Sequence, residues 1–445
     1  MTSLWEEVAR QIEEFRATIR SRPVLCPAPA TTVRQEIESK FDLTQSTPLD
    51  ELTRAVGEVL QSRSILVTHP RYFGLFNPTV TDGGIVADTL AALYNPQLAT
   101  WSHSPAANEI EHLTLRYLAG CLGYDPNTTF ANFTSGGQEA NMSAVLAAVA
   151  HHFPEAAEEG IYALRDPLAR RAIPVIYVTS ESHHTFFKIA KMAGLGMRVV
   201  SEVPVTSTFA FDTAALDAQI RADREAGRHP LMVVGTAGTT GGGIVDPLRE
   251  LGAIAREHDV WFHVDAAWGG AAVMAPRLRS MLDGIERADS ITWDAHKWLS
   301  VPMAAGMFFC RHEEAVRRAF AVSATYMPPS QDAAVDPYLT TMQWSRRAIG
   351  LKVFMTLAEA GANGIADRIE RQARMGDRLR TKLREAGWIV VNDTLLPLVC
   401  FTHGEIRSGR VTTKAMLDTI YARGHVWISD VVLGGRERVL RACIT

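Results

Sequence analysis

The sequence has few cysteines and no close cysteine pair. Five cysteines lie far apart among 445 residues, and no Cys-x-x-Cys spacing occurs. An odd number of isolated thiols argues against a disulfide framework or a structural zinc site, and it favours a reducing compartment. We therefore expect a cytoplasmic protein without a bound metal.

An excess of basic residues and a long apolar run are also missing. Lysine and arginine number 45 against 49 acidic residues, for a net charge of -4, and they form no basic stripe. Nucleic acid is therefore an unexpected partner. Apolar runs such as Val301 to Cys310 are shorter than the about 20 residues that cross a bilayer. The early acidic residues after Met1 do not resemble a signal peptide, so we expect no membrane association.

What the chain does have is enough apolar sequence for a large core. Hydrophobic residues make up 47% of it, and its length suggests two or three domains. Neither repeats nor low-complexity tracts occur. We expect an N-terminal helical segment over residues 1–66, a large α/β domain over 67–335 and a small C-terminal α/β domain over 336–445.

The N-terminal segment has helical periodicity. Apolar residues recur every three or four positions over residues 4–19, and a second helical stretch lies near residues 49–62. A proline-rich stretch beginning at Pro23 separates them. Helices of this kind form no core of their own, so they pack on the main body, on a second subunit, or on each other as a separate hairpin.

Between residues 130 and 310, short apolar runs alternate with helical patterns. This alternation predicts a mostly parallel sheet covered by helices on both faces, with ligands bound at the carboxyl ends of the strands. The predicted strands are Thr129 to Thr134, Val175 to Thr179, Leu231 to Gly235, Trp261 to Val264, Ser290 to Trp293 and Gly306 to Cys310. A helix over about Ser345 to Ala360 follows, and then strands near 388–392 and 398–401.

Two of these strands end near oppositely charged residues. Asp265 ends the run that starts at Trp261, and Lys297 follows the run that starts at Ser290. Pyridoxal phosphate needs such a pair, because its aldehyde forms a Schiff base with an amine and its ring nitrogen needs an anion. Taken singly, the aspartate could be a helix cap and the lysine a surface cation.

Three other strand ends carry residues suited to the same ligand. Ser135, Gly136, Gly137 and Gln138 lie between a strand and a helix, where backbone N–H groups and the helix dipole can hold a phosphate, although glycines also serve simple turns. His183 and His184 follow a second strand. Thr240 lies in a glycine-rich stretch after a third. Either histidine could stack on a ring or be an ordinary core or capping residue.

With these motifs in view, the chain resembles the pyridoxal-phosphate-dependent group II amino acid decarboxylases, the family of the aromatic amino acid and glutamate decarboxylases. The matching motifs are Ser135-Gly-Gly-Gln-Glu-Ala-Asn141, Ser182-His183-His-Thr185 with Lys188, Gly238-Thr-Thr240, His263-Val-Asp265-Ala-Ala267 and Asp294-Ala-His296-Lys297-Trp298. They cover roughly residues 65 to 350 in the family's order. The resemblance implies a fold-type I enzyme and a homodimer with its active site at the subunit interface.

The resemblance also implies roles for individual residues. Lys297 would carry the cofactor as a Schiff base, Asp265 would pair with the pyridine nitrogen, and His296 would lie beside the phosphate. His183 matches the ring-stacking position when counted from Thr185, whereas counting from Ser180 favours His184; we choose His183. The remaining cofactor contacts implied are Ser135, Gly136, Gly137, Gln138, Thr240, Ala267 and Asp294.

The implied reaction is decarboxylation of an L-amino acid to an amine and CO2. Tyr326 lies where aromatic amino acid decarboxylases carry a lid tyrosine that donates a proton, which favours plain decarboxylation over aldehyde formation. The alternative for Tyr326 is a buried loop aromatic. Two rival functions remain open, namely oxidative deamination or transamination with the same cofactor, and a catalytically silent binding subunit.

The substrate is expected to be aromatic. Phe76 and Trp101 belong to two aromatic-rich irregular stretches, which suit the wall of a pocket for an apolar side chain and a buried loop equally well. Arg441 matches an arginine of glutamate decarboxylases and could bind a carboxylate instead. A glutamate- or aspartate-type decarboxylase is therefore the alternative.

Overall fold

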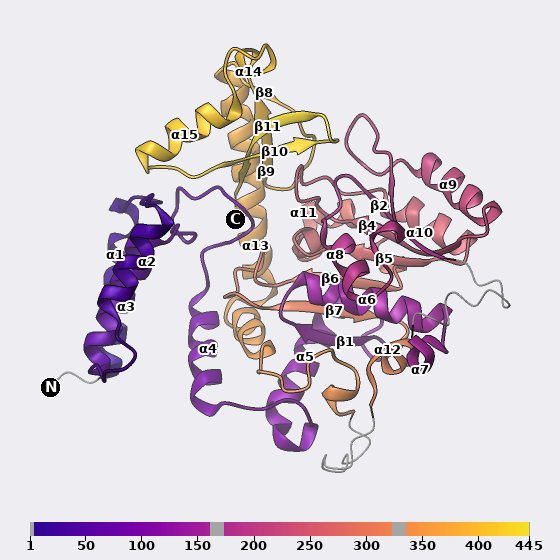
Figure 1. The fold of residues 1–445 in the computed structure, drawn as a ribbon, viewed down its shortest axis with the longest axis horizontal. Coiled ribbons are helices and arrows are strands. Elements are labelled where there is room, and N and C mark those ends of the chain that lie inside the picture. The colour runs from indigo at the N-terminus through magenta and orange to yellow at the C-terminus, as the bar shows by residue number, and fades with distance from the viewer. Residues whose placement is uncertain (1–3, 161–172, 323–334, 445) are drawn as a thin grey trace.

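A computed structural model describes residues 4–160, 173–322 and 335–444. Within these residues, seven strands form a central sheet in the order β1-β7-β6-β5-β4-β2-β3 (Figure 1). Strands β2 to β6 run parallel to one another, whereas β7 is antiparallel to both β6 and β1. The strands are β1 (Phe130–Thr134), β2 (Pro174–Thr179), β3 (Val200–Val203), β4 (His229–Thr236), β5 (Trp261–Asp265), β6 (Ser290–Asp294) and β7 (Gly306–Cys310). The predicted mostly parallel sheet is confirmed.

Helices cover both faces of this sheet. Apolar side chains of α6 (Gly137–His152), α8 (Thr185–Met192) and α12 (Glu313–Phe320) form one buried cluster with the strands. On the opposite face, α5 (Pro105–Cys121), α9 (Thr213–Glu225) and α10 (Leu248–Glu257) contribute to a second, larger cluster. Neighbouring strand residues such as Ile176 and Tyr177 point into different clusters. Burial on both faces explains why the strands are nearly continuous apolar runs.

All six predicted strands are present, with ends shifted by at most two residues. The edge strand β3 was not predicted, because its sequence, Val200-Ser-Glu-Val203, is short and half polar. The shorter helices between these elements are α7 (Ala156–Glu159) and α11 (Pro276–Arg279), with the 3-10 turns η2 (Trp101–His103), η4 (Met197–Val199), η5 (Gly269–Met274), η6 (Ser280–Leu282), η7 (Ile285–Arg287) and η8 (Pro337–Leu339).

A second sheet lies beside the first. Four strands of the described C-terminal region form it in the order β10-β11-β9-β8, all antiparallel. The elements are β8 (Ile389–Val390), β9 (Leu398–Thr402), α14 (Gly404–Arg407), α15 (Thr413–Arg423), β10 (Ser429–Leu433) and β11 (Glu437–Cys443). Helix α13 (Gly350–Glu385) connects the two sheets (Figure 1). The predicted helix end near residue 360 coincides with a kink at Gly361, whose φ is 63°, and the helix resumes beyond it.

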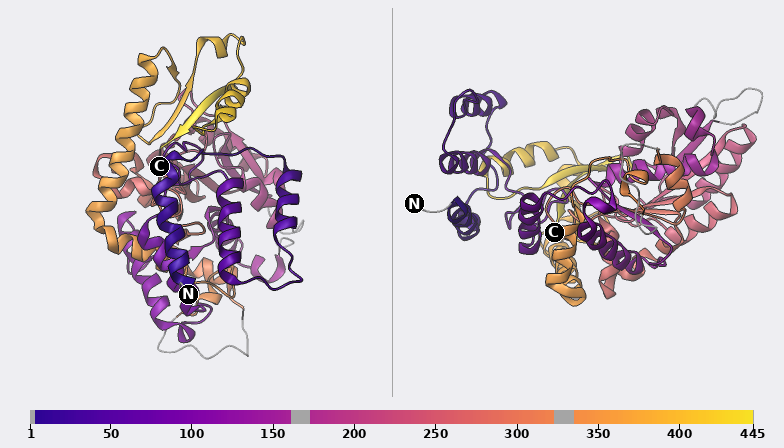
Figure 2. Two further views of the ribbon diagram at one scale, coloured as in Figure 1. Left: turned by 90° about the vertical axis from the view of Figure 1, so that its left-hand side faces the viewer. Right: turned by 90° about the horizontal axis from the view of Figure 1, so that it is seen from below.

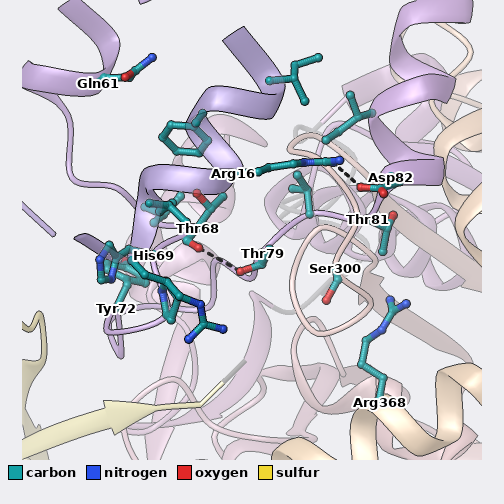
Figure 3. Close-up of a pocket in the computed structure, with 18 of the residues that line it drawn as sticks. Arg16, Gln61, Thr68, His69, Tyr72, Thr79, Thr81, Asp82, Ser300 and Arg368 are labelled. Atoms are coloured by element: carbon teal, nitrogen blue, oxygen red, sulfur yellow. Dashed lines mark hydrogen bonds and ion pairs between the residues drawn. The ribbon is translucent and has the colours of Figure 1, made fainter. Parts of the chain in front are cut away.

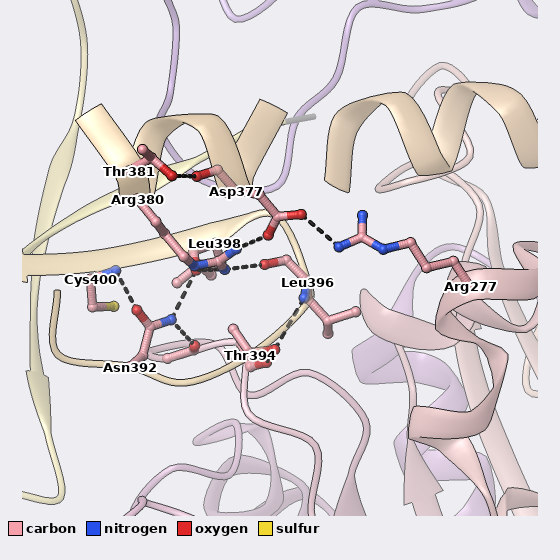
Figure 4. A network of polar contacts seen from close by, with 11 residues as sticks. Arg277, Asp377, Arg380, Thr381, Asn392, Thr394, Leu396, Leu398 and Cys400 are labelled. Atoms are coloured by element: carbon pink, nitrogen blue, oxygen red, sulfur yellow. Dashed lines mark hydrogen bonds and ion pairs between the residues drawn. The ribbon is translucent and has the colours of Figure 1, made fainter. Parts of the chain in front are cut away.

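A buried polar network ties the small sheet to the loop that follows β4 (Figure 4). Asn392 Nδ2 donates to the carbonyl of Gly242 at 2.7 Å, and Thr394 Oγ1 donates to the carbonyl of Gly243 at 2.9 Å. Arg380 on α13 donates to the carbonyl of Leu396 at 2.6 Å. These bonds fix the loop that contains Thr240.

The N-terminal helices stand apart from the body. Helices α1 (Leu4–Thr18), α2 (Ala30–Lys40) and α3 (Leu49–Arg63) pack on one another at one side of the molecule, as Figures 1 and 2 show. Of these, α2 was not predicted. Helix α4 (Asp82–Tyr94) then joins this segment to the body by packing on α13. No helix in the described ranges is both long and apolar enough to cross a membrane.

Candidate active site

A cavity of about 180 Å³ opens at the carboxyl ends of the central strands. Residues from the ends of β4, β5 and β6, the start of α6 and the β2–α8 turn line it. The lining residues are Phe76, Gly137, Gln138, Asn141, His183, Thr236, Gly238, Thr240, Asp265, Ala267, Trp268, Asp294, His296 and Lys297. The cavity thus brings together residues that are up to 221 positions apart in the sequence, as Phe76 and Lys297 are.

Asp265 ends the central strand β5 and is buried. Its Oδ2 accepts a hydrogen bond from Asn141 Nδ2 at 2.9 Å, and its Oδ1 accepts one from the Ala267 backbone N–H at 3.1 Å. Two donors hold the carboxylate in one orientation. The site therefore contains a buried carboxylate whose position is fixed.

Lys297 follows β6 and faces the same cavity. Its Nζ lies 3.0 Å from Asp294 Oδ2 and 5.6 Å from the centre of the Phe76 ring. His296 is buried and its pKa is lowered, chiefly by that burial. Because its Nδ1 accepts from the Ala305 N–H at 3.2 Å, Nε2 carries the hydrogen of the neutral ring. The amine of Lys297 and the neutral N–H donor of His296 are thus adjacent in the sequence and at the cavity.

The start of α6 has no room for a side chain at Gly137. A Cβ atom there would lie 2.9 Å from Asp294 Oδ2 and 3.4 Å from the Ala267 Cβ, so glycine is required by close packing. The first backbone N–H groups of a helix have no partner within it and attract anions. Gly136 precedes this helix, and a Cβ atom on it would lie 3.6 Å from His296 Cε1.

Ser135 is outside the residues that line the cavity. Its hydroxyl donates to Glu139 Oε2 at 2.6 Å, and its backbone N–H donates to the same oxygen at 2.9 Å. Gln343 Nε2 donates to this carboxylate as well, at 2.8 Å. The serine hydroxyl is therefore engaged in the turn itself.

Of the two adjacent histidines, His183 lines the cavity. Partial desolvation by the surrounding residues lowers the pKa of its imidazole, and its Nδ1 accepts from the Thr185 N–H at 3.2 Å. Both histidine side chains are exposed in the single chain, but the His184 ring packs against Phe187, at 6.2 Å between centroids, and does not line the cavity. A neutral imidazole is thus available at the cavity from His183.

Two buried oxygen atoms in the cavity wall lack a partner. Among the described residues, Thr236 Oγ1 and Asp294 Oδ1 have no hydrogen bond. Buried polar groups are nearly always satisfied, so these atoms indicate a polar ligand. Together with the amine of Lys297, the anion of Asp265 and the helix start at Gly137, they fit pyridoxal phosphate, which has an aldehyde, a basic ring nitrogen and a phosphate.

The three residues predicted to contact substrate lie at different places. Phe76 is in the cavity wall, with its ring 4.9 Å from that of Trp268. Arg441 packs against it, with Cζ 4.8 Å from the Phe76 ring centre, but does not line the cavity. Trp101 does not line it either, and its Nε1 donates to Glu109 at 2.7 Å. Tyr326 lies outside the described residues.

Four cavity residues had no predicted role, namely Asn141, Thr236, Gly238 and Trp268. Asn141 was part of a recognised motif, and its position four residues after Gly137, one turn along α6, could have placed it on the same helix face. Thr236 pairs directly with Asp265 in the parallel register of β4 and β5. Trp268 stacks on Trp298 at 5.2 Å, a contact that no local sequence pattern predicts.

Comparison with known proteins agrees with the cofactor inferred from the cavity. The pyridoxal-dependent decarboxylase conserved domain matches residues 33–403. The chain is 26% identical over 435 residues to an aromatic-L-amino-acid decarboxylase of Bacillus atrophaeus, covering 96% of this chain and 87% of that protein. It is 27% identical over 404 residues to an acidic amino acid decarboxylase of Mus musculus (89% and 72%). It is also 28% identical over 373 residues to a 4-hydroxyphenylacetaldehyde synthase of Rhodiola rosea (82% and 75%).

Solved structures match over nearly the whole chain. The Oryza sativa tryptophan decarboxylase structure with pyridoxal phosphate and tryptamine has a TM-score of 0.91 at 25% identity, covering 99% of this chain and 92% of that one. Mouse CSAD matches in fold, with a TM-score of 0.90 at 23% identity over 99% and 93%. The names of these relatives indicate different substrates, whereas the two solved structures share the fold of this chain. The chain belongs to the pyridoxal-dependent decarboxylase family, whose cofactor is pyridoxal phosphate.

Proposed function

We propose that this protein decarboxylates an aromatic L-amino acid to the corresponding amine and CO2. The observation that carries the proposal is that Lys297 and Asp265 line one cavity together with the start of α6. Bound pyridoxal phosphate supplies an electron sink for the electron pair left by the departing carboxyl group. The protein's task is to hold that cofactor, fix its charge and exclude water.

Each end of the cofactor would have its own set of residues. Lys297 would hold the aldehyde end covalently, and Asp265 would hold a proton on the ring nitrogen by its negative charge. At the phosphate end, the backbone N–H groups after Gly136 and the Nε2–H of His296 are the donors. Gln138, Thr240, Ala267 and Asp294 would complete the contacts. Ser135 would join them only if its hydroxyl left Glu139.

His183 would stack on the cofactor ring. Its lowered pKa keeps the imidazole neutral at neutral pH, so that it adds no positive charge next to a protonated pyridine ring. Tyr326 stays a prediction as the residue that returns a proton to the substrate α-carbon. The amine of Lys297 lines the same cavity and could take part in proton transfer.

The substrate class is inferred from the cavity wall. Phe76 and Trp268 place two large aromatic rings beside Lys297, which suits an apolar substrate side chain. The Arg441 guanidinium is already used by two backbone carbonyls, donating to Gly74 at 2.8 Å and to Thr240 at 3.1 Å. Trp101, predicted for this wall, does not line the cavity of its own chain.

A second candidate, decarboxylation of an acidic amino acid, is favoured by one specific observation. Arg441 is buried, and its Nη2 has no hydrogen-bond partner among the described residues. A buried cation without a carboxylate is costly, and a substrate carboxylate would satisfy it. The two candidates therefore predict opposite substrate preferences.

A panel of L-amino acids given to the purified holoenzyme separates the two candidates. We expect phenylalanine, tyrosine or tryptophan to be converted with a kcat/KM at least about 100-fold above that of glutamate and aspartate, because Lys297, which would hold the cofactor, is the one lysine or arginine among the described residues that line the cavity. CO2, amine and peroxide are measured together, since peroxide with an aldehyde product would indicate oxidative deamination. Arg441→Met is the matched variant. A preference for glutamate that this variant abolishes would establish the acidic candidate.

We also propose that two copies of the chain form a homodimer through the N-terminal segment of residues 1–66. A groove of about 1050 Å³ lies between α1 and the body, with Arg16 on one wall and Ser300 and Arg368 on the other (Figure 3). Apolar residues of α1 such as Ile12 and Phe15 also line it. Several large apolar side chains in this segment are exposed, namely Trp5, Ile37, Leu43, Leu49, Val56 and Leu60. Such exposed apolar surface marks a protein interface. Domains over 67–335 and 336–445 would form the rest of each subunit.

The dimer is tested by a charge on that surface. Leu60→Glu, at a position that is 59% exposed in the single chain, should shift the protein from twice the chain mass to the chain mass in analytical ultracentrifugation. The matched control is Met192→Glu on α8, which is 53% exposed and outside the segment. A wild-type protein that sediments as a monomer would contradict the proposal.

A further inference from the structure

Behind Asp265 runs a chain of hydrogen bonds that the catalytic proposal does not use. Asn141 Oδ1 lies 2.9 Å from His263 Nε2, His263 Nδ1 lies 2.8 Å from Ser290 Oγ, and Trp261 Nε1 donates to the same Ser290 Oγ at 2.8 Å. With the Asn141 to Asp265 bond at 2.9 Å, four bonds connect five residues. All five side chains are buried. We call this set the relay.

The direction of each bond follows from Asp265. An ionised carboxylate only accepts, so Asn141 must turn its amide NH2 toward Asp265 and its oxygen toward His263. His263 must then carry a hydrogen on Nε2. Its burial lowers the pKa of the imidazole to about 4, so the ring is neutral and Nδ1 is an acceptor for the Ser290 hydroxyl. Ser290 in turn accepts from Trp261, and every donor meets an acceptor.

Rigid elements hold these residues. Trp261, His263 and Asp265 alternate along β5 and therefore point to the same face of the sheet, where Asn141 on α6 meets them. Ser290 is the direct parallel partner of His263 on β6. The relay thus has one arrangement, fixed by strand register, and its N–H bonds all point toward the carboxylate.

We propose that Asn141 and His263 are positioning residues that decide where the proton shared by Asp265 and the cofactor ring nitrogen rests. Two arrangements compete in a buried pair, an anion beside a protonated ring or a neutral acid beside an unprotonated ring. Burial alone favours the neutral arrangement, and a donor to the carboxylate favours the charged one. The relay supplies that donor and prevents Asn141 from turning its oxygen toward Asp265.

The inference deepens the proposed function and rests on it, because it requires bound pyridoxal phosphate. The proton position is measured directly by NMR of the cofactor labelled at its ring nitrogen, in the holoenzyme at neutral pH without substrate. The wild type should show a protonated nitrogen. Asn141→Ala and His263→Phe should move the equilibrium toward the unprotonated form roughly 10- to 100-fold, because a hydrogen bond to a charged group is lost.

Turnover gives a second readout. In Asn141→Ala and His263→Phe, kcat should fall roughly 10- to 100-fold in parallel with the proton shift, and KM should change little, because substrate contacts are intact. His263→Gln can still present an N–H near the Nε2 position, so it should restore the protonated ring and most of kcat. Ser290→Ala should have a smaller effect of the same sign, since it only stabilises the His263 tautomer.

Loss of a buried hydrogen bond can also lower activity through the fold. Tyr177→Phe serves as the matched control, because Tyr177 is buried on β2 and donates to Asp223 at 2.9 Å, away from the cavity. Tyr177→Phe should lower the melting temperature without changing the protonation of the cofactor ring nitrogen. If the relay variants keep a protonated ring nitrogen while kcat falls, the inference is overturned and the proposed function stands. If the wild type binds no cofactor, the proposed function itself fails.

Discussion

Replacing Lys297 with alanine is expected to abolish turnover, with kcat at least about 10⁴-fold lower than in the wild type. The reason is that Lys297 offers the amine that faces the anion of Asp265 across one cavity. Without it the cofactor would be held only by its phosphate and ring contacts. Borohydride reduction followed by peptide mass spectrometry should find the cofactor attached at Lys297 in the wild type and at no lysine in the variant.

The control for this experiment is Lys191→Ala. Lys191 is exposed on α8, so its loss should leave both the covalent attachment and the rate unchanged. Cofactor attached to a different lysine, or turnover near the wild-type rate in Lys297→Ala, would refute the assignment of the site.

The second large effect is expected for Asp265→Ala. This variant should still attach the cofactor through Lys297, but its kcat should fall roughly 10³- to 10⁴-fold, because nothing then holds a proton on the ring nitrogen. Asp265→Asn tests whether the negative charge or the shape of the side chain is needed, since the amide has nearly the same shape and no negative charge. We expect both variants to be similarly impaired and both to show the unprotonated ring in the NMR measurement.

Asp223→Asn is a matched loss of a buried carboxylate. Asp223 accepts from Tyr177 and pairs with Arg228 at 2.9 Å, outside the cavity. It should cost stability and leave kcat per folded molecule unchanged. An Asp265→Ala enzyme with a normal rate would show that the anion is not needed and would remove the basis for the relay as well.

Local patterns in the sequence were sufficient to predict six of the seven described strands of the central sheet. Strands buried on both faces are apolar runs of five to eight residues such as β5 and β4, and each can be recognised alone. Because the carboxyl ends of parallel strands meet at one edge, Asp265 and Lys297 could be expected near each other. That expectation needed no knowledge of side-chain contacts.

What the sequence could not predict depends on contacts between distant segments. Asn141 acquires its place only because α6 packs over β5, and the preference of Ser135 for Glu139 is set by a rotamer. The position of Arg441 against Phe76 requires the small sheet to dock beside the large one. Spacing along the chain contains none of this information.

Helices and their ends were harder to predict from the sequence than strands. Helix α2 has few apolar residues and none that is buried, so its periodicity is weak. The predicted end of the helix near residue 360 reflected a real backbone break at Gly361, but packing on both sides carries α13 on to Glu385. Tertiary contacts override local preference at such positions.

The bonds from Asn392 and Thr394 to the carbonyls of Gly242 and Gly243 have a consequence for protein engineering. The loop after β4 takes its shape from residues about 150 positions later in the chain. A chimera that exchanges this loop between relatives without its C-terminal partners would leave buried carbonyl groups without donors, at a cost of about 1–3 kcal/mol each. Grafts intended to alter substrate choice should therefore transfer the loop and residues 392–394 as one unit.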